Sequence, residues 1–118
     1  MQEILIIIND APYGTEKAYN AIRLANQLLK DHEDVRVKVF FMADAVTCPI
    51  DKQKTPDGYY NIAKMLKLFV RKGGVGGTCG TCMDARGIDE SSLLKGIHRS
   101  NMVEFANWTK NADKVITF

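Results

Sequence analysis

The first half of the chain alternates between continuous apolar blocks and a segment with helical spacing. Residues 4–8 are all aliphatic, a pattern typical of a strand buried on both faces of a parallel sheet. Residues 35–42 alternate at first and then continue as the apolar run 40–42, which predicts a second strand. Between the two blocks, apolar residues recur every three or four positions as far as Lys30, and Thr15 and Glu16 suit the N-cap and the first turn of a helix. Strand, helix and strand predict a right-handed βαβ unit.

The middle of the chain continues this order with weaker signals. Residues 44–58 are polar and are expected to form a long loop, a feature that is often functional in compact domains. Helical spacing over residues 60–71 predicts a second helix, which Lys72 and Gly73 would end. Residues 75–79 are mostly glycine and valine, yet the alternation of elements places a short third strand there.

The C-terminal part of the chain predicts two helices and a closing strand. A short helix is expected over residues 90–94, with Asp89 as its candidate cap. Asn101, followed three residues later by Glu104, resembles a capping box at the start of the last helix. Residues 114–118 are expected to form the final strand. No linker or internal repeat interrupts the pattern, so we expect residues 1–118 to form a single α/β domain.

Composition and charge exclude several classes of partner. The chain has 118 residues, of which 46% are hydrophobic and 25% charged, as in ordinary globular domains. Its net charge of +2 is too small to indicate nucleic-acid binding, so no direct nucleic-acid partner is expected. Basic residues gather between Lys52 and Lys72, which favours a solvated helix face over a surface for an acidic partner or anionic substrate. No apolar segment approaches the ~20 residues of a membrane span, and no signal peptide is recognisable, so we expect a cytoplasmic protein without a membrane partner.

The strongest chemical signal is the pair Cys79 and Cys82, separated by Gly80 and Thr81 and followed by Arg86. A thiolate is the nucleophilic form of cysteine, and a neighbouring cation lowers its pKa. In a reducing compartment, three cysteines with one close pair favour chemistry over a set of structural disulfides. If residues 80–83 form a helical turn, the two sulfurs come within disulfide range.

Three polar segments are expected to meet near this thiol pair. Ligands of open α/β sheets bind outside the carboxyl ends of the parallel strands. Residues 9–15, 43–48 and 79–87 each follow a predicted strand at that edge. The residues expected to carry the chemistry are Cys79, Cys82 and Arg86. The residues expected to bind the substrate lie in the same segments; they are Tyr13, Gly14, Thr15, Asp44, Gly80 and Thr81.

Two of these residues have an alternative role. Arg86 would either stabilise a thiolate or persulfide anion or form a salt bridge with a nearby carboxylate. The free N–H groups at the start of the first helix, with Thr15, could hold an anion, but simple capping is the favoured role of this threonine. The carboxylates that could pair with the arginine follow or precede it closely in the sequence; they are Asp84, Asp89 and Glu90.

The spacing of the cysteines and the arginine excludes other enzyme classes. A phosphatase or rhodanese cradle separates its cysteine from its arginine by five residues, whereas six residues separate Cys79 from Arg86 and three separate Cys82 from it. A structural zinc site needs four ligands, and only Cys48 and His98 could complete the pair. No Ser-His-Asp order or phosphate-loop motif is present. We therefore expect no resident metal or cofactor.

Taken together, these motifs resemble the DsrE/DsrF-like family, and within it the small single-domain members. The resemblance extends from end to end of the chain. It rests on five stretches in the same order: residues 11–14, 41–46, 58–62, 79–88, and the final pair 108–109 with 112–115.

The resemblance implies a fold, an assembly and a chemistry. The fold would be a three-layer α/β/α arrangement around a mostly parallel sheet of about five strands, assembled as homotrimers or homohexamers. Family members that act in sulfur relays accept sulfane sulfur as a cysteine persulfide and pass it to a partner protein. The acceptor cysteine stands eight positions before the glycine of an Arg-Gly pair, which here is Cys79 before Gly87. Cys82 matches the second cysteine of the single-domain members, and Cys48 matches none.

Three functional hypotheses follow from the residues and the resemblance. The first is a sulfur carrier or sulfurtransferase that holds a persulfide on Cys79 and exchanges sulfur with a donor or acceptor protein. The second is a dithiol redox switch that uses Cys79 and Cys82. The third is a small-molecule binding module with a pocket between residues 12–14 and the cysteine loop.

Overall fold

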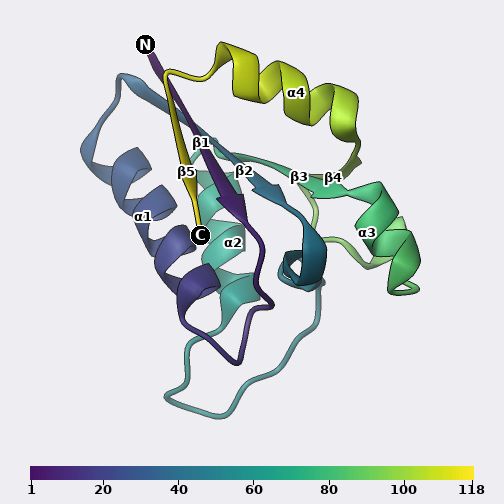
Figure 1. Cartoon of the computed structure of the whole chain (residues 1–118). Coiled ribbons are helices and arrows are strands. Elements are labelled where there is room, and N and C mark those ends of the chain that lie inside the picture. Colours follow the sequence, from purple (N-terminus) through teal and green to yellow (C-terminus); the bar gives the residue numbers. More distant parts are fainter.

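The chain folds around one sheet of five parallel strands, as a computed structural model of residues 1–118 shows (Figure 1). The strand order is β4-β3-β2-β1-β5. The strands are β1 (Gln2–Ile8), β2 (Val35–Phe41), β3 (Val75–Cys79), β4 (Ile97–Ser100) and β5 (Lys114–Thr117), and every neighbouring pair is parallel. The expected α/β class is therefore confirmed.

Helices cover both faces of the sheet, which gives the expected three layers (Figure 1). On one face, α1 (Lys17–Asp31) and α2 (Ile62–Arg71) pack on alternate residues of β1 and β2, such as Ile6 and Val39. On the other face, α4 (Met102–Asn111) and the short α3 (Gly80–Ala85) cover the intervening residues, including Leu5 and Phe40. Because both faces of β1 are covered, its apolar residues are continuous rather than alternating.

The predicted elements differ from the structure at several ends. Helix α1 begins at Lys17 with Glu16 as its N-cap, so Glu16 does not lie in the first turn and Thr15 is not the cap residue. The Thr15 hydroxyl donates to Asp10 at 2.8 Å and accepts the Lys17 N–H at 3.4 Å, so it still makes one weak hydrogen bond to the start of α1. Helix α2 begins at Ile62 rather than residue 60, since the side chain of Asn61 accepts the Lys64 N–H and starts the helix there.

The C-terminal half contains one strand that the sequence pattern did not predict. Strand β4 is short and polar, and it lies at the sheet edge beside β3. The short helix expected over residues 90–94 is a single 3-10 turn (Glu90–Ser92), and Asp89 makes no capping hydrogen bond. Asn101 does cap α4 by accepting the Glu104 N–H at 2.9 Å, but the Glu104 carboxylate bonds Ser100 and His98 instead of completing a capping box.

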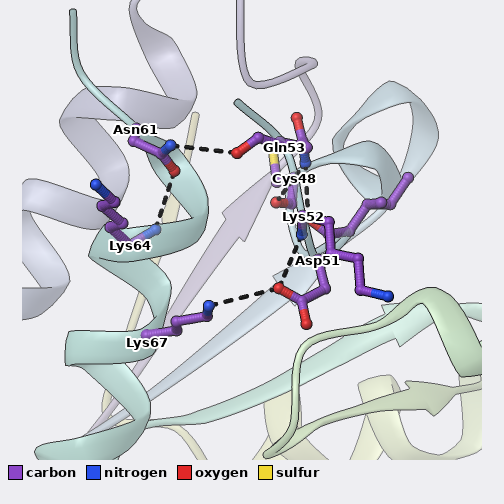
Figure 2. A network of polar contacts seen from close by, with 8 residues as sticks. Cys48, Asp51, Lys52, Gln53, Asn61, Lys64 and Lys67 are labelled. Carbon is purple, nitrogen blue, oxygen red and sulfur yellow. Dashed lines mark hydrogen bonds and ion pairs between the residues drawn. The ribbon is translucent and has the colours of Figure 1, made fainter. Parts of the chain in front are cut away.

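The loop before α2 is long, and side-chain hydrogen bonds hold it in place. It begins with a 3-10 turn (Ala43–Thr47), and the side-chain amide of Gln53 donates to the carbonyl oxygens of Thr47 and Ile50, each at 2.9 Å. Figure 2 shows this loop joined to α2 through Asn61, whose amide donates to the Gln53 carbonyl. None of the helices has the length and apolar character needed to cross a bilayer.

Candidate functional site

The three polar segments predicted to meet do converge at the carboxyl edge of the sheet. The Cys48 thiol donates to the Asp10 carbonyl at 3.5 Å, which joins the loops after β2 and β1. The Ala43 N–H donates to the Cys82 sulfur at 3.3 Å, which joins the loops after β2 and β3. The parallel order of β1, β2 and β3 places these segments side by side although they lie far apart in the sequence.

Cys79 occupies the junction between β3 and α3. It is the last residue of the strand and the N-cap of the helix, and only 7% of it is exposed. Burial raises the pKa of its thiol, and a side-chain hydrogen bond with Cys82 raises it further, while the N–H groups of Cys82 and Thr81 act in the opposite direction. The resting group is therefore a protonated thiol, held against the N–H groups that would stabilise its anion.

Cys82 lies one helical turn after Cys79 and is more accessible. Its side chain is half-buried, and its sulfur accepts the N–H of Ala43. Ala43 has a φ of 52°, a left-handed conformation that costs a non-glycine residue free energy. That strained backbone directs an N–H group at a sulfur atom, which is the kind of donor that stabilises a thiolate.

Arg86 is committed to a partner that the sequence did not suggest. Its guanidinium donates to Asp44 Oδ1 through Nη2 at 2.8 Å and Nε at 3.1 Å, and Nη1 donates to the Cys82 carbonyl at 3.0 Å. The expected salt bridges to the carboxylates near Arg86 in sequence do not form, because α3 turns the guanidinium toward the loop after β2. The carboxylates excluded in this way are Asp84, Asp89 and Glu90.

Arg99 is a second cation of the site, and it was not predicted from the sequence. It lies on β4 and forms two hydrogen bonds of 2.9 Å with Asp84. These bonds raise the pKa of Arg99, and the nearby Cys79 raises it further when it is a thiolate. The guanidinium lies against Gly80, where a Cβ would fall 2.7 Å from it. No sequence signal marked Arg99, because strand β4 was not recognised.

The residues expected to bind substrate divide into two groups. Three of them lie beside the cysteine pair. Asp44 accepts hydrogen bonds from Arg86, Gly80 lies against Arg99, and the Thr81 N–H acts on the Cys79 sulfur. Tyr13 points elsewhere: its hydroxyl accepts the Ile62 N–H at 3.2 Å, and its ring packs near Tyr59 and Tyr60.

The two residues after Tyr13 make local contacts before α1. Thr15 bonds Asp10, and Gly14 supplies a turn with a φ of 113°. The thiol pair and Asp44 therefore form one cluster, while residues 13–15 belong to the entrance of α1. No group of three or more acidic, histidine or cysteine side chains gathers anywhere to hold a metal ion.

Taken as a class, this is an α/β protein with a dithiol at the carboxyl edge of a parallel sheet. A model of the DsrE/DsrF-like family matches residues 2–118, so the chain belongs to that family. It is 42% identical to protein YchN of Escherichia coli K12 over 118 residues, which cover all of both chains. An uncharacterized protein of Methanopyrus kandleri is 36% identical over 115 residues, or 98% of this chain and 93% of that protein.

Solved structures agree with this assignment. The crystal structure of YchN from Escherichia coli matches with a TM-score of 0.94 at 42% identity, and the match covers both chains fully. A protein of unknown function from Methanobacterium thermoautotrophicum matches the fold with a TM-score of 0.80 at 17% identity, again over both full chains. The family resemblance drawn from five stretches of sequence is thereby confirmed.

Proposed function

We propose that this protein carries sulfane sulfur as a persulfide on Cys79. The observation that supports this best is the position of Cys79, the last residue of β3 and the N-cap of α3, one helical turn before Cys82 at the carboxyl edge of the sheet. Membership of the DsrE/DsrF-like family adds support, since sulfur relay is a chemistry of that family.

The proposed loading step is a thiol–persulfide exchange. The Cys79 thiol first loses its proton to water or to the donor, because the thiolate is the nucleophile. It attacks the terminal sulfur of a donor persulfide, R–S–SH. The donor S–S bond breaks, the donor leaves as a thiolate, and a new S–S bond on Cys79 holds the transferred sulfur. No external oxidant or reductant is needed.

Release can follow by either of two routes. An acceptor thiolate can take the terminal sulfur and restore the Cys79 thiol. Alternatively, the Cys82 thiolate can attack the Cys79 sulfur, which forms a Cys79–Cys82 disulfide and expels hydrosulfide. The Ala43 N–H would stabilise the Cys82 thiolate in that step, and Arg86 would hold the loop of Asp44 and Ala43 in place.

The test is the mass of the reduced protein after exposure to glutathione persulfide, followed by peptide mapping. We expect a gain of one sulfur on the peptide containing Cys79, which a thiol reductant reverses; a sulfinic acid has nearly the same added mass but resists reduction. Cys79→Ser should abolish the gain, Cys82→Ser should keep it, and Cys48→Ser is the matched control. Full loading of Cys79→Ser would overturn the proposal.

A dithiol switch is the second candidate, and the placement of both thiols at the first turn of α3, Cys79 as its N-cap and Cys82 three residues later, favours it. In this case a peroxide or a disulfide would accept two electrons and two protons from the pair and leave a Cys79–Cys82 disulfide. The same mass measurement separates the two functions. A loss of two hydrogens in the parent chain would support the switch if Cys82→Ser, which cannot expel hydrosulfide by forming the internal disulfide, also gains no sulfur.

We further propose a homotrimer or homohexamer that exchanges sulfur with a donor or acceptor protein in the cytoplasm. The assembly is supported by exposed apolar side chains on α4, Met102 and Val103, which are 61% and 72% exposed in the single chain. A reducing compartment suits the three cysteines, which are all free thiols. Neither a metal nor a cofactor enters this chemistry.

A further inference from the structure

Away from the thiols, the chain has a cavity of about 750 Å³ between the first turns of α1 and α2 and the loop before α2. Its volume lies in the range typical of small-molecule sites. Its lining includes the cations Arg23, Lys54 and Lys64 and a single carboxylate, that of Asp57. The cysteine pair does not line it, so this site is separate from the proposed sulfur chemistry.

The three cations at the rim are uncompensated. None of Arg23, Lys54 and Lys64 takes part in an ion pair, whereas Lys67, one turn further along α2, pairs with Asp51 at 3.5 Å. Figure 2 shows Lys67 directed at Asp51, with Lys64 nearer the start of the same helix. An adjoining cavity of about 420 Å³ shares Arg23 and adds Lys30 and Lys72. The local charge therefore favours an anion.

Stacked tyrosines form one wall of the cavity. The rings of Tyr59 and Tyr60 stack at 4.6 Å between centroids, and those of Tyr60 and Tyr19 at 4.2 Å. Arg23 lies over the Tyr19 ring at 5.2 Å, at one end of this stack. At the other end Tyr59 is 51% exposed, which leaves aromatic surface available to a planar ring.

The wall is also held in shape before any ligand binds. Asn61 and Gln53 fix the loop to α2 and to its own carbonyl groups, as Figure 2 shows. The Tyr13 hydroxyl accepts the Ile62 N–H and so ties the start of α2 to the segment before α1. Preorganised side chains lose little conformational entropy on binding.

From this combination we infer that the cavity binds a small anion with a planar aromatic ring, the chemistry of a nucleoside monophosphate. The ring stacks on Tyr59, and the phosphate lies among Arg23, Lys54 and Lys64. Both parts are required: charge alone would accept inorganic phosphate equally well, and stacking alone would accept the uncharged nucleoside.

The experiment is calorimetric titration of the full chain with AMP, adenosine and inorganic phosphate at low ionic strength. We expect saturable binding of AMP that is tighter than that of adenosine or phosphate. Lys64→Gln should weaken AMP binding about tenfold, as the loss of one charge-assisted hydrogen bond implies. Tyr59→Ala should also weaken it, and Lys67→Gln, whose cation is already paired on the same helix, should not.

The position of the bound nucleotide is determined separately, by soaking crystals with 8-bromo-AMP and locating the bromine by its anomalous signal. A bromine beside Tyr59 supports the proposal. Absence of AMP binding, phosphate binding as tight as that of AMP, or a bromine at the cysteine loop would each overturn it. Cys79→Ser, which removes the proposed sulfur acceptor, should bind AMP as the parent chain does, so the two proposals can fail independently.

Discussion

At the scale of single residues, the three thiols differ in burial and therefore in reactivity. Cys82 is half-buried, whereas Cys79 is nearly buried and its pKa is raised by burial and by its bond to Cys82. We expect iodoacetamide to alkylate Cys82 first at neutral pH, and Cys79 more slowly, at a rate that rises as the pH becomes alkaline. Peptide mapping after timed quenching measures this order. Faster labelling of Cys79 than of Cys82 at neutral pH would contradict it.

Cys48 should affect stability in a pH-dependent way. Burial raises the pKa of this thiol far above that of an unfolded cysteine, which is about 8.5. The folded state therefore favours the neutral thiol, and this contribution to the free energy of unfolding is complete below about pH 8.5 and falls as the pH rises beyond it. We expect Cys48→Ala to be destabilising at neutral pH and the difference from the parent chain to shrink at alkaline pH.

Urea unfolding of both proteins at a neutral and an alkaline pH measures the effect of Cys48→Ala. Cys79→Ala, which removes a less buried thiol, serves as the comparison. A cost of Cys48→Ala that grows with pH would show that the thiol is not held neutral by the fold.

The residues of the candidate site were predictable only in part. Cys79 and Cys82 were evident from spacing, because a thiol pair near a cation carries a chemical signal of its own. The partner of Arg86 was not predictable, since Asp44 lies 42 residues away and only the parallel packing of β2 and β3 brings the two together. Tyr13 was placed in the wrong neighbourhood for the same reason: sequence order says which edge a loop leaves, not the direction of its side chains.

At the scale of elements, the glycines of β3 have a packing role that explains why so poor a strand former is a strand. A Cβ on Gly77 would lie 3.0 Å from the Trp108 ring, and one on Gly76 would lie 3.1 Å from Ile97. The Trp108 ring of α4 therefore packs directly against the backbone of β3. The low strand propensity of glycine argues against a strand here, but it is offset by the close packing of α4 and β4 that the glycines allow.

We expect Gly77→Ala to destabilise the fold by ~1–3 kcal/mol through overpacking against Trp108. In a chain that already carries Trp108→Leu, the smaller side chain leaves room, and the same glycine substitution should cost less. Thermal or urea unfolding of the four proteins gives the coupling free energy. Strictly additive effects would show that the glycine is present for another reason, such as strand twist.

At the scale of the whole molecule, the apolar blocks were enough to predict a parallel α/β sheet, because strands buried on both faces leave long aliphatic runs. Strand β4 escaped prediction for a converse reason. It is four residues long, contains His98 and Arg99, and pairs only along one edge with β3, so no apolar pattern marks it. Because Arg99 lies on this strand, it was absent from the set of site residues predicted from the sequence.

The outer face of α4 is the surface that we expect to join copies of the chain. No residue of this helix is fully buried in the single chain, yet Met102 and Val103 are apolar and largely exposed. If these side chains form a contact between copies, Val103→Glu places a charge in an apolar interface, at a cost that well exceeds that of an exposed charge. We expect the parent chain to have the mass of a trimer or hexamer in light scattering, and Val103→Glu to be smaller.

Asn111→Glu is the matched control for this change, since it adds the same charge to an exposed position of α4 on the side of the helix opposite Met102. It should retain the parent mass, while circular dichroism confirms that both variants are folded. If Val103→Glu stays fully assembled, α4 lies outside the contact, and β5 with its exposed Val115 becomes the surface to test. A parent chain that is monomeric at every concentration would overturn the proposed assembly itself, whichever surface is considered.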